Sequence, residues 1–128
     1  MRALLDTRAF LWWNSNDARL TDAVREIIAD GRNEIFLSAA SAWEIAIKFN
    51  RGRLTLPEHP EKYVSTRMLL HHFQPLPVQL SHALHVCTLP DHHRDPFDRL
   101  LVAQSRLEKL PLLTADPEIA RYDVTILW

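Results

Sequence analysis

One stretch of the chain, IFLSAASAWEIAIKF at residues 35–49, reads as a strand that runs directly into a helix. Its first three residues form a continuous apolar run, which is typical of a strand covered on both faces. The remainder spaces its apolar side chains at the i, i+3, i+4 and i+7 positions of an amphipathic helix: Ala42, Ile45, Ala46 and Phe49. Such a strand–helix unit is the building block of parallel α/β sheets.

The same alternation continues along the whole chain. Short apolar runs predict strands at residues 3–5, 35–37, 112–114 and 124–127. Helical signals predict helices at residues 7–13, 21–29, 39–49, 60–72, 81–86, 96–109 and 118–122, with Thr21 and Ser81 as N-caps and Gly31 as a stop. Residues 73–78 contain Pro75 and Pro77, so they can form a strand only at a sheet edge. We therefore expect one α/β domain over residues 1–128, with a short central parallel sheet covered by helices on both faces.

Composition sets limits on the class of protein. A chain of 128 residues with 47% hydrophobic content can bury a sizeable core in one domain. The two glycines are too few for a Gly-rich phosphate loop or for long flexible linkers. A formal net charge of −1 excludes a protein that holds nucleic acid mainly through a bulk positive field, although it permits a local basic rim.

The compartment is predicted from what the sequence lacks. No apolar run approaches the roughly 20 residues of a membrane helix, and the segment before Asp6 is too short for a signal peptide. The lone Cys87 cannot form an internal disulfide, which favours a reducing compartment. We therefore expect a cytoplasmic protein without a membrane partner, and Cys87 as a small buried residue.

Four acidic residues share a placement near the predicted strand ends. Asp6 follows the first strand, Glu44 lies about one turn into the helix after the second, Asp98 opens a helix, and Asp116 follows Thr114. The carboxyl ends of parallel strands form one crevice, and four carboxylates gathered there cannot all stay ionised without a cation. Hard oxygen ligands select Mg²⁺ or Mn²⁺. The pattern predicts a metal-dependent phosphoryl-transfer site.

Two of these acids have a local structural explanation that competes with metal binding. Asp6 suits the N-cap of the first helix. Glu44 could complete a capping box with Ser41 or pair with Lys48 at i+4. If Ser38 is the N-cap instead, Glu44 falls in the second turn and is free to point at the strand ends.

The other two acids also resemble helix starts. Asp95 suits the N-cap position, Pro96 the first helical position and Asp98 the third, where the helix dipole favours an acid. Asp116 followed by Pro117 is a similar start. Each acid alone is weak support for a metal site, and the shared topological placement of four is the stronger signal.

Four segments together resemble a PIN domain, and more narrowly the VapC-like ribonuclease toxins of bacterial toxin–antitoxin pairs: residues 4–7, 37–48, 93–104 and 113–116. The resemblance implies a Mg²⁺ site, in which Mn²⁺ may substitute, formed by Asp6, Glu44, Asp98 and Asp116. It also implies supporting hydroxyls on Thr7 and Thr114 and an extra acid at Asp95. The implied function is an endoribonuclease toxin that hydrolyses RNA through a metal-activated water, forms homodimers and is covered by a cognate antitoxin.

Basic residues lie close in sequence to the acids and are candidates for contacts with RNA phosphates. They are Arg8, Lys48, Arg51, Arg53, Arg94 and Arg99. The seven histidines lack metal-ligand spacing and are expected to be structural or surface residues, with His71 and His72 at a helix end that favours cationic character. Trp12 and Trp13 are adjacent on one helix, so one of them is expected to face away from the core, either in an interface or as an incidentally exposed aromatic.

Two other functions fit the same acids. One is a different Mg²⁺-dependent phosphoryl-transfer enzyme such as a phosphatase, although Asp6-Thr7-Arg8 lacks a second acid two positions on. The other is a PIN-like or receiver-like binding module without catalysis, in which removal of a carboxylate changes partner binding and no nuclease activity exists to lose.

Overall fold

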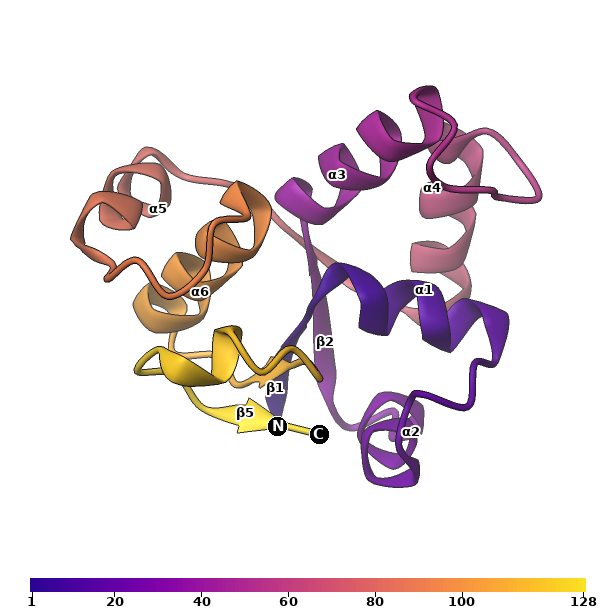
Figure 1. Ribbon diagram of the computed structural model, residues 1–128. Helices are drawn as coiled ribbons and strands as arrows, with labels where there is room; N and C mark the ends of the chain where they lie inside the picture. The colour runs from indigo at the N-terminus through magenta and orange to yellow at the C-terminus, as the bar shows by residue number, and fades with distance from the viewer.

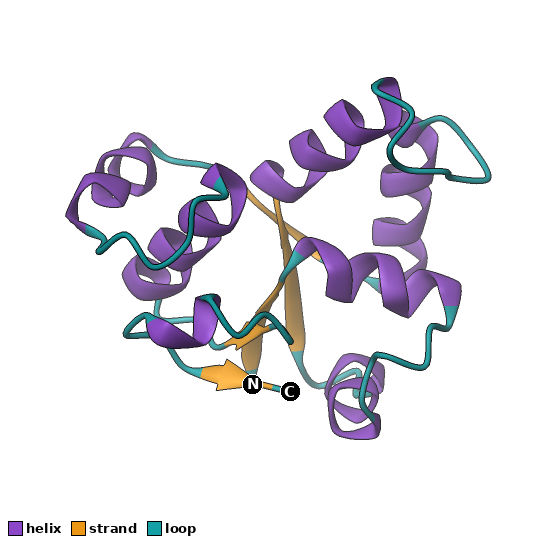
Figure 2. Ribbon diagram, viewed as in Figure 1, coloured by secondary structure: helices purple, strands orange, loops and turns teal.

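The computed structural model describes all residues 1–128 and contains a five-stranded parallel sheet between helical layers (Figures 1 and 2). The strand order is β3-β2-β1-β4-β5, so β1 lies at the centre. The strands are β1 Arg2–Leu5, β2 Glu34–Ser38, β3 Gln74–Leu76, β4 Leu112–Leu113 and β5 Ile126–Leu127. All four strand pairings are parallel, as the strand–helix alternation predicts.

Six α-helices and two 3₁₀ turns surround the sheet. They are α1 Thr7–Ser15, α2 Asp22–Ala29, α3 Ala39–Asn50, α4 Pro60–His71, α5 Leu80–His85, η1 Val86–Thr88, α6 Pro96–Glu108 and η2 Ile119–Arg121. Helices α1, α2, α3 and α4 contribute to one hydrophobic core, whereas α6 and η2 contribute to a second. Successive side chains of β1 point to opposite faces of the sheet, so Ala3 and Leu5 belong to the first core and Leu4 to the second. The predicted fold class is confirmed.

The proline-containing segment forms an edge strand, as predicted. β3 pairs only with β2, with Pro75 opposite Leu37. Proline has no N–H to donate, so it is tolerated where no further strand lies beyond it.

Several element boundaries differ from the sequence prediction. Helix α5 begins at Leu80 with Gln79 as its N-cap, so the prediction of Ser81 as the cap is wrong. The reason is a local capping box, in which the buried His82 ring accepts the Gln79 backbone N–H through Nδ1 at 2.9 Å. Residues 118–122 form only a short 3₁₀ turn, and the last strand begins at Ile126.

The side-chain environments of the tryptophan pair and of Cys87 also differ from expectation. Trp12 and Trp13 are both half-buried against the first core, so neither faces away. The Trp12 ring packs against Trp128 at 5.8 Å, and the Trp13 ring packs against His71 at 5.6 Å. Cys87 is exposed. Periodicity within one helix cannot reveal that a distant terminus covers its second face.

His71 ends α4 as predicted, but its expected cationic character is wrong. Burial lowers the pKa of His71, and the charges of Arg67 and His72 lower it further. Separately, no helix combines the length and apolar character that crossing a membrane requires.

Candidate metal centre

Asp6 lies at the carboxyl end of the central strand and is only 5% exposed. Its Oδ1 accepts the Ala9 backbone N–H at 2.7 Å, so the predicted N-cap role is confirmed. Its Oδ2 accepts a hydrogen bond from the hydroxyl of Thr114, which lies at the end of the neighbouring β4. Parallel pairing of β1 with β4 thus brings together two residues that are 108 positions apart.

The Asp6 carboxyl is poorly suited to carry a negative charge unless a cation is near. Burial raises the pKa of Asp6 to about 6, although the hydrogen bonds from Thr114 and Ala9 act in the opposite direction. A group that is nearly removed from water and still titrates near neutral pH is a marker of a functional site.

Asp98 lies in the first turn of α6, and its pKa is raised further than that of Asp6. Burial raises the pKa of Asp98 to about 7, and the charges of Asp95, Glu44 and Asp6 add to that rise. Asp95 is the N-cap of α6 and accepts the backbone N–H groups of Phe97 at 2.8 Å and Asp98 at 3.1 Å. The structural role predicted for Asp95 is confirmed, and the charges of Asp95, Glu44 and Asp6 lie near enough to Asp98 to raise its pKa.

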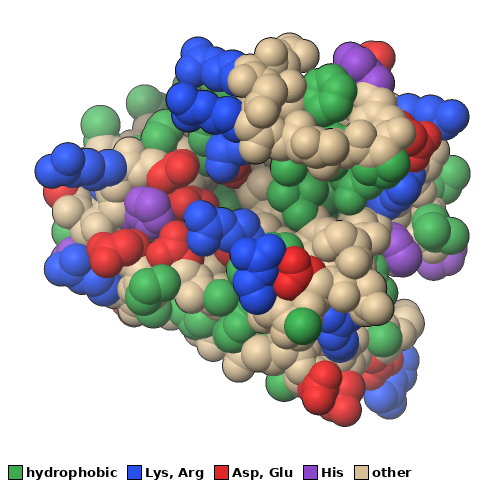
Figure 3. Space-filling model, turned by 45° about the vertical axis from the view of Figure 1, so that its right-hand side comes forward, with side chains coloured by type: hydrophobic (Ala, Val, Ile, Leu, Met, Phe, Trp, Pro, Cys, Tyr) green, Lys and Arg blue, Asp and Glu red, His purple; other side chains and the backbone are tan.

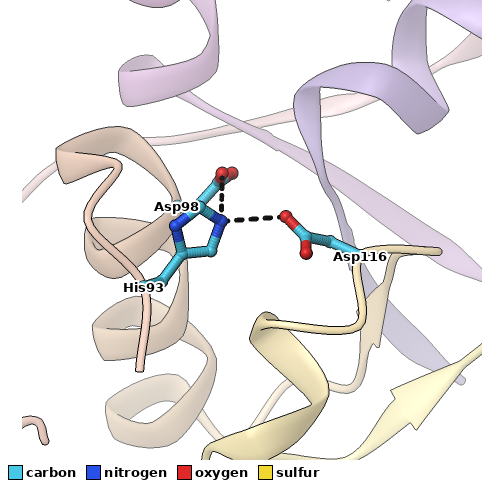
Figure 4. A group of neighbouring side chains, drawn as sticks. All are labelled: His93, Asp98 and Asp116. Atoms are coloured by element: carbon cyan, nitrogen blue, oxygen red, sulfur yellow. Dashed lines mark hydrogen bonds and ion pairs between the residues drawn. The ribbon is translucent and has the colours of Figure 1, made fainter. Parts of the chain in front are cut away.

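His93 lies between Asp98 and Asp116 (Figure 4). Its Nε2 is 3.1 Å from Asp98 Oδ2 and 2.9 Å from Asp116 Oδ2, and the three side chains offer ligand atoms within 4.8 Å of one another. Burial lowers the pKa of His93, but the hydrogen bond to Asp116 and the nearby carboxylate charges outweigh it and raise that pKa overall. His93 is therefore the one histidine that lies among the acids of the candidate site, which its spacing in the sequence does not indicate.

The second ring nitrogen of His93 decides how the ring acts. Nδ1 accepts the Asp95 backbone N–H at 3.1 Å, so a neutral His93 carries its proton on Nε2. In this orientation the ring donates to the two carboxylates and does not present a lone pair to an ion. The donor set that faces the crevice is therefore oxygen, which fits Mg²⁺ or Mn²⁺. An ion held by the same oxygens would compete with His93 for them.

Glu44 lies on α3 and is 4% exposed. Its Oε1 accepts the Thr7 hydroxyl at 2.6 Å, and its Oε2 pairs with Lys48 Nζ at 2.6 Å. Ser38 is the N-cap of α3, so the capping box with Ser41 does not form, and Ser41 Oγ instead lies 2.9 Å from the Thr7 hydroxyl. The predicted ion pair with Lys48 is present, and the other carboxylate oxygen faces the first helix.

Asp116 is tied to Asp6 through Thr114. The Asp116 backbone N–H donates to the Thr114 hydroxyl oxygen at 3.1 Å, while that hydroxyl donates to Asp6. Asp116 Oδ1 accepts the Glu118 N–H at 2.9 Å, which leaves Oδ2 for His93. The four acids therefore form two groups: Asp98 and Asp116 meet at His93, whereas Asp6 and Glu44 are each held by a threonine hydroxyl.

Five of the six predicted phosphate contacts are exposed: Arg8, Lys48, Arg51, Arg53 and Arg94. Acidic and histidine side chains gather on one face beside lysine and arginine side chains, next to a hollow in the surface (Figure 3). Arg99 is different, because its side chain is only 14% exposed. Its guanidinium donates to the carbonyls of Val86 at 3.1 Å and Pro90 at 3.0 Å and to the Tyr122 hydroxyl at 3.2 Å. The expectation of an RNA contact at Arg99 is therefore wrong.

Replacement of Arg99 tests this structural role. We expect Arg99→Lys to lower the free energy of unfolding by about 1–3 kcal/mol, because an ammonium cannot reproduce the planar fork that reaches these several acceptors at once. The exposed Arg94→Lys is the matched control and should change stability by no more than about 0.5 kcal/mol. Urea denaturation of both variants measures the difference, and equal stabilities would refute this structural role of Arg99.

Comparison with known proteins places this architecture in a family. A sequence model described as PIN domain matches residues 3–124. Ribonuclease VapC16 of Mycobacterium tuberculosis is 49% identical over 67 residues, a match that covers 50% of this chain and about half, 48%, of that protein.

Solved structures show the same fold at low sequence identity. VapBC2 from Rickettsia felis, bound to a DNA fragment from its promoter, superposes with a TM-score of 0.70 at 16% identity and covers 100% of this chain and 98% of that chain. FitAcB from Neisseria gonorrhoeae gives a TM-score of 0.65 at 18% identity, and the match covers 100% of this chain and 97% of that chain. With nearly its whole length matched by the family model, the chain belongs to the PIN domain family.

Proposed function

We propose that this protein is a metal-dependent endoribonuclease and the toxin of a toxin–antitoxin pair. The observation that carries the proposal is the convergence of Asp98 and Asp116 within 4.8 Å of His93, beside Asp6 with its raised pKa, at the strand ends of a PIN domain. The partial similarity to a protein named as a ribonuclease supports the same reaction class.

Asp6, Glu44, Asp98 and Asp116 would hold one or two Mg²⁺ ions, or Mn²⁺ in their place. The bound ion would supply positive charge that activates a water molecule for attack on phosphorus and stabilises the leaving oxygen. The protein's own contribution is positioning. Thr114 orients the Asp6 carboxylate and Thr7 orients Glu44, so that neither carboxylate must reorganise when substrate binds.

The substrate is held through its backbone in this proposal. Arg8, Lys48, Arg51, Arg53 and Arg94 are exposed and lie close in sequence to the acids, so they are available for contacts with phosphates on either side of the cleaved bond. A chain of net charge −1 needs such a local rim, since it lacks a general positive field.

We further propose a cognate antitoxin as the protein partner, a homodimer as the assembly and the cytoplasm as the compartment. Structural likeness to VapBC2 and FitAcB supports the antitoxin. The exposed Cys87, without a partner for a disulfide, is compatible with a reducing compartment.

Purified protein incubated with labelled RNA tests the function. We expect cleavage with Mg²⁺ or Mn²⁺, loss of cleavage in EDTA and recovery when Mn²⁺ is added back. Cleavage that continues in EDTA would refute the metal mechanism. Toxicity on expression should disappear with Asp98→Asn and persist with Asp91→Asn, which changes a fully exposed acid. Absence of any cleavage, with partner binding that depends on the acids, would instead identify a binding module.

A further inference from the structure

Trp43 is an aromatic side chain whose position the core does not explain. It lies on α3 directly before Glu44, and it is 62% exposed, whereas Trp12, Trp13 and Trp128 are half-buried. The buried face of α3 is supplied by residues such as Ile45. A large apolar surface that remains in water at a candidate active site is available for a ligand.

The Trp43 ring is held in place by a second aromatic ring from α6. Trp43 and Phe97 form an edge-to-face pair with ring centroids 5.3 Å apart and an interplanar angle of 79°. Phe97 directly precedes Asp98, just as Trp43 directly precedes Glu44. The pair therefore joins two helices beside two of the acids and fixes the orientation of an exposed ring before any ligand arrives.

Basic residues continue from the aromatic pair along the same helix. Lys48, Arg51 and Arg53 lie at the end of α3 and in the turn that follows, and all three are exposed. Proteins that bind single-stranded nucleic acid combine such a basic track with aromatic rings on which bases stack. A base inside a duplex has no free face, so this arrangement favours an unpaired base.

We propose that Trp43, braced by Phe97, is a stacking platform for an unpaired RNA base beside the cleaved phosphate. This inference rests on the proposed nuclease function and deepens it. An interface with a second protein copy is the competing use of an exposed aromatic, but no other large exposed apolar residue lies on α3 or in the first turn of α6. A protein interface needs a broader apolar centre than one ring.

The test measures binding separately from cleavage. Binding of fluorescein-labelled oligoribonucleotides of mixed sequence is followed by anisotropy in EDTA, so that the RNA stays intact. We expect Trp43→Leu to weaken binding of single-stranded RNA by about 5- to 100-fold, which corresponds to the loss of one stacked base. Trp43→Phe should keep most of the affinity, and the exposed Leu69→Ala on α4 is the control that should change nothing.

Two further readouts distinguish stacking from a general loss of structure. Trp43→Leu should leave affinity for duplex RNA unchanged, and in Mg²⁺ it should raise KM with little change in kcat. Oligoribonucleotides of one sequence can each carry a single abasic site at a different position. One of these positions should weaken binding to the unaltered protein, whereas the same abasic site should not change the affinity of Trp43→Leu.

Specific results would overturn the platform. Equal affinity of Trp43→Leu and the unaltered protein for single-stranded RNA would refute the stacking role of Trp43. Cleavage of RNA in Mg²⁺ by both proteins would still support the nuclease function. A change of oligomeric state in Trp43→Leu, measured by light scattering, would assign the ring to a protein interface. Binding that depends on Trp43 without any cleavage in Mg²⁺ would support the platform and refute the nuclease.

Discussion

Asp6→Asn is expected to reduce the rate of RNA cleavage by about 100-fold or more, a loss of roughly 2.7 kcal/mol or more of transition-state stabilisation. The substitution removes one negative charge from a carboxylate that lies 5% exposed at the end of the central strand. Metal affinity depends on that charge, whereas the helix cap depends only on an acceptor oxygen. Asparagine retains an oxygen for the Ala9 N–H, and its amide can donate to Thr114.

Stability should move in the opposite direction to activity. Burial raises the pKa of Asp6 to about 6, so ionised Asp6 opposes folding at pH 8 when metal is removed. We therefore expect Asp6→Asn to have an equal or higher Tm than the unaltered protein in EDTA at that pH. Isothermal titration with Mn²⁺ should show weaker binding. Asp91→Asn is the matched control, and an active Asp6→Asn protein or a sharply destabilised one would contradict the assignment.

The metal-free protein should lose stability as pH rises from about 4 to about 7. The pKa of Asp6 is raised to about 6 and that of Asp98 to about 7, both above the ordinary value of 3.8. In this window the folded state binds more protons than the unfolded state, so the free energy of unfolding falls with rising pH. The contribution of protonated Asp6 and Asp98 to the free energy of unfolding is fully present below pH 3.8. It is lost once both acids ionise in the folded protein, an effect on the order of a few kcal/mol.

Two groups with lowered pKa values oppose this trend: Glu58 adds stability as pH rises toward 4.5, and His71 adds stability as pH rises toward 6.5. The shifts of Asp6 and Asp98 are larger, so the net trend keeps its direction. The raised pKa of His93 acts in the same direction, because its charged form is lost as pH rises through the folded pKa. Asp17 and Asp30 have pKa values lowered to about 2 by their arginine neighbours, so they contribute only below the window.

Denaturation in EDTA at pH 5 and pH 8 measures the predicted difference. Mn²⁺ should raise Tm more at pH 8 than at pH 5, since protons and the ion compete for the same carboxylates. Asp98→Asn should flatten the pH dependence, whereas Asp91→Asn should leave it unchanged. Stability that is constant or rising between pH 5 and pH 7 would contradict the raised pKa values.

The structural and functional explanations of the acids prove compatible. Asp6 is a helix N-cap and also accepts the Thr114 hydroxyl at the end of β1, and Glu44 pairs with Lys48 while its other oxygen accepts the Thr7 hydroxyl. Asp95 alone is accounted for by capping, although its charge raises the pKa of Asp98. A capping explanation therefore does not count against a functional role for Asp6.

The sequence by itself determined the alternation of strands and helices, the caps at Thr21 and Asp95, and the edge position of the Pro75 strand. These features depend on hydrogen bonds and side-chain periods that span a few residues. Local patterns thus suffice for most of the elements and for these two caps.

Only the tertiary structure decided how His93, Arg99 and Trp12 are used. His93 reaches Asp116 across 23 positions, Arg99 holds Tyr122 across another 23, and Trp12 is covered by the C-terminal Trp128. Each environment is created by an element that is distant in sequence, and no period or motif encodes which distant element becomes the neighbour. Burial, which sets the pKa of Asp6 and Asp98, arises from the same long-range packing.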